Sequence, residues 1–277
     1  MKNAANNGNY LLLALFFLGS LFFFQSFKTY SEDSSLEDVM TKMNAQTTKL
    51  SKLSFTIKNC ERIGTKMMCG KQQVSIQLKP FKCRLTTSKP NAGDQIVYNE
   101  EQSPKATYIP KGFPYINVNL EPLGTKMMNN NHHSIFELGF VFFTQLINHY
   151  YQNNKTSFSI QKVTEGENQY YKVTSSFNDF KYVNYTVRKS ENFRNIAHKK
   201  FISEYLIAEK NTEKEFYIEG DKLSIPSHYY KKLVLKIDAV NFTPTYIEIF
   251  DDKGLLEKYE FSELDTAPKF TEQTFKE

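Results

Sequence analysis

The sequence of 277 residues contains no tryptophan, and it also lacks the short motifs that mark the common enzyme classes. There is no Gly-x-Ser-x-Gly, no His-Glu-x-x-His, no phosphate-binding glycine loop and no dinucleotide-binding glycine pattern. We therefore expect a protein that is not an enzyme and that uses no cofactor. The aromatic residues that are present, 17 Tyr and 24 Phe, favour a sheet-rich fold.

The chain also has little net charge and few cysteines. The net charge is +5, and no dense cluster of Lys and Arg with interleaved aromatic residues occurs, so nucleic acid is not an expected partner. Cys60, Cys69 and Cys83 show no Cys-x-x-Cys spacing, and histidine is sparse near them, so we expect no metal site. Either two of them form a disulfide in an oxidising compartment, or all three are reduced thiols.

One long hydrophobic run stands near the amino terminus. Residues 3–27 carry no charge, and residues 10–24 are nearly all Leu and Phe. Such a run engages the export machinery. We expect residues 1–28 to be a signal peptide or a membrane anchor, with residues 10–27 in the membrane if they are not cleaved. The rest of the chain, residues 29–277, is then expected in the periplasm or cell envelope, either exported or anchored in the inner membrane.

The pattern after this run is typical of antiparallel strands with a few helices. Residues 53–57 and 74–78 alternate between apolar and polar side chains, and tight turns separate such segments. A helix is expected before them, opened by a capping box of Ser34 and Glu37. Short strands joined by turns indicate an antiparallel meander rather than parallel βαβ units.

A second helix is expected from Ser134 to about Tyr151, opened by a capping box of Ser134 and Glu137. His132 and His133 stand just before it. His133 and Glu137 would lie one helical turn apart, but two ligands alone do not make a metal site. We therefore interpret the two histidines as residues that precede the helix.

Residues 187–226 form a pattern of their own. A strand reaches Val187, two short helices follow, and a second strand ends at Pro226. This order and spacing resembles the LysM module, a small βααβ unit that binds glycans containing N-acetylglucosamine, such as peptidoglycan. Residues 190–192 read Ser-Glu-Asn where the module usually has Gly-Asp-Thr.

The LysM resemblance implies an insert at residues 184–230 and peptidoglycan as a partner. The insert either contacts glycan or has only a structural role. The residues that would contact the glycan lie in the turns beside the two helices: Lys189, Ser190, Glu191, Asn192, Asn211 and Gly220.

Outside this insert, two stretches resemble the LolA/LolB lipoprotein-carrier superfamily. Residues 78–98 match its pattern of a basic residue, a proline, an aromatic residue, a second proline and a strand, and residues 245–261 match its final hairpin. Residues 61–64 (Glu-Arg-Ile-Gly) and 132–139 further resemble an uncharacterised bacterial envelope family of that fold, some members of which carry a LysM-like insert.

This second resemblance implies an α+β fold. Residues 29–183 and 231–277 would form a curved antiparallel half-barrel plugged by helices, interrupted by the small βααβ insert. Lys79 stands where the carriers have an arginine implicated in their lid. Lysine keeps the charge but lacks the planar fork of arginine.

The carrier resemblance also implies a function. We expect a non-enzymatic envelope protein that binds a lipid or a lipoprotein acyl chain in the half-barrel and is positioned by the glycan-contacting insert. The alternative is a peptidoglycan-associated structural protein with a filled core and no lipid ligand. The residues expected to line the lipid cavity are Phe55, Ile57, Val74, Ile76, Leu78 and Lys79.

Overall fold

A single antiparallel sheet organises the computed structural model, which describes residues 34–214 and 216–277. Its strands are β1 (Lys52–Ile63), β2 (Lys66–Leu78), β3 (Phe81–Lys89), β4 (Gln95–Asn99), β5 (Ala106–Ile109), β6 (Val118–Leu120), β7 (Phe158–Glu165), β8 (Asn168–Ser176), β11 (Lys232–Asp238), β12 (Pro244–Asp251) and β13 (Gly254–Asp265). The expected signal peptide or anchor, residues 1–28, lies outside the described residues. Within the described ranges, no helix has both the length and the hydrophobicity that a membrane crossing requires.

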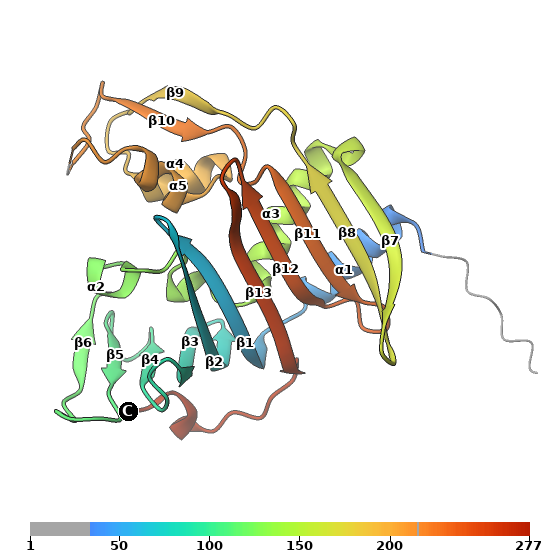
Figure 1. The fold of residues 1–277 in the computed structure, drawn as a ribbon. Helices are drawn as coiled ribbons and strands as arrows, with labels where there is room; N and C mark the ends of the chain where they lie inside the picture. The colour runs from blue at the N-terminus through green and yellow to red at the C-terminus, as the bar shows by residue number, and fades with distance from the viewer. Residues whose placement is uncertain (1–33, 215) are drawn as a thin grey trace, which may run out of the picture. The chain divides into compact units, whose positions relative to one another are not determined.

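The eleven strands lie in the order β6-β5-β4-β3-β2-β1-β13-β12-β11-β8-β7. Every neighbouring pair is antiparallel, and β1 near the start of the chain pairs with β13 near its end. The sheet twists along its length and stays open, with β6 and β7 as its edges (Figure 1). The predicted α+β class with one large antiparallel sheet is therefore confirmed.

Two helices, α1 (Leu36–Thr48) and α3 (Phe140–Asn153), cover one face of the sheet (Figure 1). Ser35 caps α1 by accepting a hydrogen bond from the backbone N–H of Asp38, so the helix cap is one residue later than the predicted Ser34. The other helical segments are α2 (Thr125–Met128), α4 (Phe193–Lys200), α5 (Glu204–Lys210) and the 3₁₀ turns η1 (Ile135–Glu137), η2 (Lys155–Ser157) and η3 (Glu272–Phe275).

The core fills the space between α3 and the centre of the sheet. Because side chains alternate along a strand, Phe55 on β1 and its partner Val74 on β2 point to the same covered face. The ring of Phe55 lies 6.4 Å from that of Phe140 on α3 and 5.8 Å from that of Phe261 on β13. These aromatic contacts occupy the middle of the covered face.

The prediction of one helix from Ser134 to Tyr151 is wrong in one respect, because the helix is interrupted at Gly139. The predicted capping box of Ser134 and Glu137 is present, but it opens the single turn η1, and α3 begins only at Phe140. Gly139 has φ 77° and ψ −175°, a backbone region that is essentially restricted to glycine. A Cβ at this position would lie 2.8 Å from Cζ of Phe55.

The βααβ order predicted for residues 184–230 is present. Strands β9 (Tyr182–Thr186) and β10 (Lys222–Pro226) pair antiparallel, and α4 and α5 lie between them in the chain. This βααβ unit has a small hydrophobic core of its own, built from Val187, Ile196, Ala197, Ile202, Ile207, Leu223 and Ile225. Its likeness to a LysM module stays a prediction.

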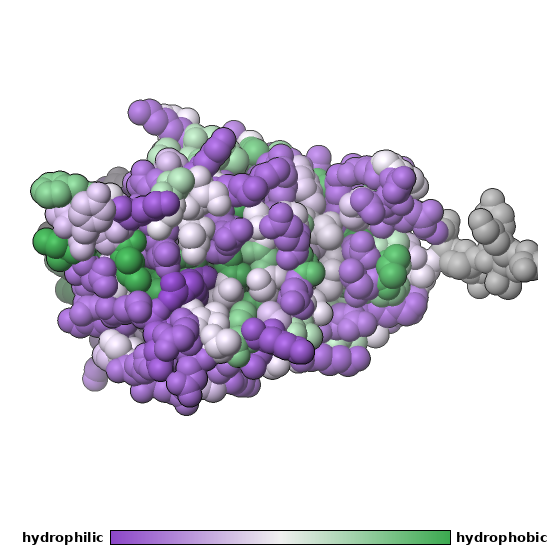
Figure 2. Space-filling view, turned by 90° about the horizontal axis from the view of Figure 1, so that it is seen from below, coloured by the Kyte–Doolittle hydropathy of each residue, from purple (hydrophilic) through white to green (hydrophobic). Residues whose placement is uncertain are grey.

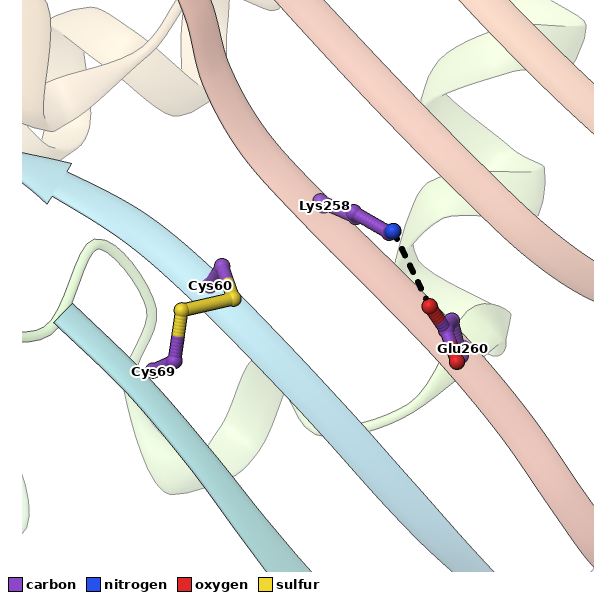
Figure 3. The surroundings of a disulfide bond; sticks show 4 residues. All are labelled: Cys60, Cys69, Lys258 and Glu260. Atoms are coloured by element: carbon purple, nitrogen blue, oxygen red, sulfur yellow. Dashed lines mark ion pairs between the residues drawn. A yellow bond between two sulfur atoms is a disulfide. The ribbon is translucent and has the colours of Figure 1, made fainter. Parts of the chain in front are cut away.

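A disulfide joins Cys60 on β1 to Cys69 on β2, directly opposite each other in the sheet (Figure 3). Cys83 is a buried free thiol, and burial raises its pKa. On β13, Lys258 and Glu260 form an ion pair of 3.0 Å beside this disulfide (Figure 3). Of the two alternatives for the cysteines, the structure thus has one bridged pair and one free thiol.

We expect Gly139→Ala to destabilise the protein more than Gly166→Ala. Both glycines have positive φ, so each alanine costs about 1–3 kcal/mol of backbone strain. Only at Gly139 does the new methyl group also collide with Phe55, whereas nothing lies within 4 Å of the position at Gly166. Denaturant unfolding of both variants measures the difference, and equal losses would contradict the tight packing at Gly139.

Candidate ligand-binding site

A pocket of about 380 Å³ lies between the loop that precedes α3, α3 itself and helices α4 and α5. Its apolar lining comes from the loop, from α3, and from α4 with the residues that follow it: Phe136, Phe142, Leu146, Ala197, Phe201 and Ile202. Its polar lining comes from the loop, α3, α4, α5 and the segment before β11: His132, His133, Glu137, Gln145, Arg194, His198, Glu204 and Tyr229. The pocket therefore has an apolar and a polar part.

Glu137 joins the loop to α4 at one side of the pocket. Its Oε1 accepts hydrogen bonds from Arg194 Nη2 at 3.2 Å and from His198 Nε2 at 2.9 Å. Its Oε2 accepts from the N–H of Ser134 at 2.9 Å, within the capping box. Arg194 also donates from Nη1 to Glu204 on α5 at 3.2 Å. The charged groups on this side are thus paired with one another.

Glu257 on β13 joins the loop to the sheet on the other side. Its side chain is 0% exposed, and its Oε1 lies 2.9 Å from Nδ1 of His132, while its Oε2 lies 3.2 Å from Nε2 of His133. The hydroxyl of Tyr229 also donates to Glu257, at 3.4 Å. A buried carboxylate without such partners would be strongly unfavourable, so these contacts fix the position of the loop.

His132 makes contacts through its backbone, both ring nitrogens and the face of its ring. Its Nε2 lies 2.8 Å from the carbonyl oxygen of Arg62, so both ring nitrogens face acceptors. Its backbone N–H donates to Glu61 at 2.6 Å. The ring of Tyr205 stacks on it at 3.8 Å, which ties α5 to the loop.

Burial and charge act in opposite directions on the pKa values of this cluster. Burial alone would raise the pKa of Glu257, but His133 and His132 lower it to about 2. Burial alone would lower the pKa of His133, but the Glu257 carboxylate, with Glu61 and Glu137, raises it to about 9. At neutral pH the site therefore holds a carboxylate and an imidazolium that stabilise each other.

This arrangement suits binding. The Ser134 hydroxyl donates to Glu137 at 3.0 Å and accepts from Arg194 at 3.0 Å, so it faces a carboxylate and a guanidinium and not a histidine base. In the described part of the chain, no group of three or more His, Cys, Asp or Glu side chains is arranged to hold a metal ion. With the charges paired, the apolar side chains are what the pocket offers to a ligand.

The structure places the six residues predicted to line a lipid cavity mostly in the core. Phe55, Val74 and Ile76 are buried beneath the helices. Ile57 lines a small cavity of about 90 Å³ beneath the loop, together with His133 and Glu137. Leu78 is partly buried at the end of β2, and Lys79 is exposed in the turn that follows. The pocket described above lies elsewhere, beside α3.

The six residues predicted to contact glycan all belong to the βααβ unit, and five of them make hydrogen bonds within it. Asn192 caps α4, and Glu191 accepts from Tyr185 and from the N–H of Arg188. Asn211 is buried and bonds both α5 and β10, and the N–H of Gly220 donates to Val187. Lys189 and Ser190 are exposed in the turn, and the carbonyl oxygen of Ser190 accepts from Nδ2 of Asn195 at 3.4 Å.

The interpretation of His132 and His133 as residues that only precede a helix missed their role. They bind Glu257, which lies about 125 positions later in the chain. Arg194 and His198 were also missed, because in sequence they are ordinary polar residues of a short helix. The two adjacent histidines before an apolar helix were the one local signal, and it did not identify the partner.

No protein-family model matches this sequence, and no curated protein matches it. Among solved structures, LprF from Mycobacterium bovis is 11% identical over 86% of this chain and 96% of that chain, with a TM-score of 0.44. Lipoprotein LppX from Mycobacterium tuberculosis is 10% identical over 85% and 99%, with a TM-score of 0.38. A LolA superfamily protein from Nitrosomonas europaea is 9% identical over 88% and 98%, with a TM-score of 0.32.

We expect the stability of the protein to fall at both ends of the pH range. The raised pKa of His133 stabilises the fold fully below pH 6.5, and this contribution is lost as the pH rises to about 9. The lowered pKa of Glu257 stabilises it above pH 4.5, and this is lost as the pH falls towards 2. Denaturant unfolding across this range should show the highest stability between pH 4.5 and 6.5.

Glu257→Gln tests the same pair directly. It leaves His133 and His132 without their carboxylate, so we expect a loss of about 3–5 kcal/mol near neutral pH and a flatter profile on the alkaline side. Glu260→Gln, on the same strand but partly exposed, is the matched control and should cost at most about 1 kcal/mol. Equal effects of the two substitutions would show that the buried cluster contributes nothing particular.

Proposed function

We propose that this protein is a non-enzymatic binding protein of the cell envelope that holds the acyl part of a lipid or lipoprotein in the pocket beside α3. The observation that carries the proposal is the pairing of the pocket's charges, which leaves Phe142, Leu146 and Phe201 as its ligand-facing surface. Burial of each methylene group stabilises a complex by roughly 0.8 kcal/mol, so a chain of about ten carbons would bind usefully even after ordering costs.

The polar part of the pocket supports an amphiphile rather than a plain hydrocarbon. Gln145 is exposed at its rim. Its amide suits a polar head group, because it can bind oxygen atoms while the acyl chain lies against the apolar wall. The Cys60–Cys69 disulfide supports an oxidising location such as the periplasm.

Gln145→Trp should weaken binding of a fluorescent fatty acid. Gln145 is exposed on α3 and lines the pocket, so an indole there fills space without disturbing the core. Displacement of about two methylene groups corresponds to roughly 1.6 kcal/mol, or about a tenfold loss of affinity. The measurement is a fluorescence titration of the purified full chain.

Gln152→Trp is the matched control, because Gln152 is exposed two turns further along the same helix and does not line the pocket. It should bind like the unchanged protein. The proposal fails if both tryptophan variants bind equally well, or if native mass spectrometry of the gently purified protein shows no bound lipid and no fatty acid binds on addition.

We further propose that the βααβ unit contacts peptidoglycan and thereby positions the lipid-binding part. A specific contact favours this second function: the ring of Phe193, which follows the Lys189–Asn192 turn, lies 5.4 Å from the ring of Tyr217 in the loop after α5. The two turns predicted to contact glycan therefore meet. Lys189 and Ser190 are exposed there and are available to a sugar.

The test is co-sedimentation of the full chain with purified peptidoglycan sacculi. We expect the double substitution Lys189→Ala and Tyr217→Ala to lower the retained fraction, because it removes an exposed donor and an aromatic surface where the turns meet. Lys66→Ala removes a lysine of equal charge from an exposed strand end outside this unit and should change nothing. If the unchanged protein is not retained, the glycan-binding role is excluded.

A further inference from the structure

The hairpin of β5 and β6 ends in a tip that exposes large apolar side chains. Phe113 is 90% exposed, Tyr115 70% and Ile116 63%. Three such residues within four positions differ from the scattered single apolar residues of an ordinary surface. Figure 2 shows hydrophobic residues among hydrophilic ones at the end of the molecule that holds this hairpin, on the left of that view. An exposed apolar cluster of this kind marks a contact surface.

Partly exposed apolar side chains also lead from this hairpin towards the pocket. Val118 on β6 pairs with Tyr108 on β5, and both are on the face that the helices cover elsewhere. Beyond β6, Leu123 and Phe136 line an open hollow of about 440 Å³. Phe136 also lines the pocket beside α3. Apolar surface is therefore present along this edge of the sheet, from the tip to the candidate site.

We infer that the tip, residues 112–118, docks on the interfacial layer of a lipid bilayer. Phe and Tyr at a protruding tip, with lysines nearby, have the composition of side chains that anchor proteins at the level of lipid head groups. From Lys105 to Leu120 the sequence contains two lysines and no acidic residue. The tip therefore brings no carboxylate of its own against the phosphate groups.

The backbone of the tip also suits a bilayer surface. Pro110 and Pro114 have no N–H, so they leave no backbone donor unpaired when water is displaced. The N–H of Tyr115 donates to the carbonyl of Gly112 at 2.9 Å, which closes a turn within the tip. A protruding tip of this kind can enter a fluid lipid interface directly. A protein partner, in contrast, would need a groove that is complementary to the tip.

The carboxylates beside the tip indicate how the contact is driven. Asp94 accepts hydrogen bonds from Tyr108 and from the N–H of Lys111, and Glu277 accepts from Asn117 and Thr107. These carboxylates lie beside the tip and offset part of the charge of its neighbouring lysines. Docking is therefore driven by the apolar side chains, and it should occur on zwitterionic as well as anionic membranes.

The sequence also predicts a membrane attachment for this chain. Residues 10–27 are predicted to engage a membrane, and only residues 28–34 separate them from the compact unit that begins at Ser35. Seven extended residues span at most roughly 25 Å. If that apolar segment stays uncleaved, it tethers the compact unit to a membrane.

The absence of tryptophan makes a direct test possible, because one introduced indole is the only one in the chain. In the full-length Phe113→Trp variant, phosphatidylcholine vesicles should shift the emission to shorter wavelength, and vesicles with brominated acyl chains should quench it. The added substitution Ile116→Ser should reduce the quenching. Val240→Trp, an 86% exposed site in the turn between β11 and β12, is the matched control and should show neither effect.

Each outcome of this experiment either supports or overturns docking of the tip on a bilayer. Unchanged emission of Phe113→Trp on vesicles overturns it, and so does a shift that appears without lipid and grows with protein concentration, which would indicate a second copy as the occupant. Quenching of Ile218→Trp in place of Phe113→Trp would assign docking to the βααβ unit instead. The result is separate from the pocket proposal, because soluble fatty acid binding to the pocket is measured without vesicles and does not require the tip.

Discussion

The buried carboxylate of Glu257 is the group on which the rest of the structure depends. It lies on a central strand, with 0% of its side chain exposed, and it needs both His132 and His133 for compensation. Those histidines belong to a loop, and the loop in turn is joined to α4 and α5 through Glu137 and Tyr205. One charge in the sheet thus fixes the loop, the loop fixes the βααβ unit, and the pocket is the space that remains between them.

The strands were largely predictable from the sequence, because their information is local. The alternation at residues 53–57 and 74–78 corresponds to β1 and β2, and the βααβ order follows from short-range spacing and capping residues such as Asn192. Local signals also have a limited precision. The first helix is capped by Ser35 and not by the predicted Ser34. The sequence did not distinguish these two residues, because both are serines with the same capping chemistry.

The candidate site was not predictable in the same way, because distant residues build it. Nothing near Glu257 in the sequence distinguishes it from other acidic residues on exposed strand faces, and only the register of β13 against β1 turns it towards the loop. The break at Gly139 has a similar cause. A side chain at residue 139 would meet the ring of Phe55, which lies more than eighty residues earlier in the chain. Five of the six expected cavity residues are apolar, but an apolar strand pattern cannot tell a filled core from a cavity.

The pairing of β1 with β13 has a consequence for how this chain reaches its final state. Strands β1 to β6 are complete early in synthesis, yet the inner edge of β1 has no partner until the last strand emerges. During that interval an unpaired, partly apolar edge is open to other chains. Long-range pairing of this kind is also slow. Loss of β13 would leave the centre of the sheet, rather than its margin, unfinished.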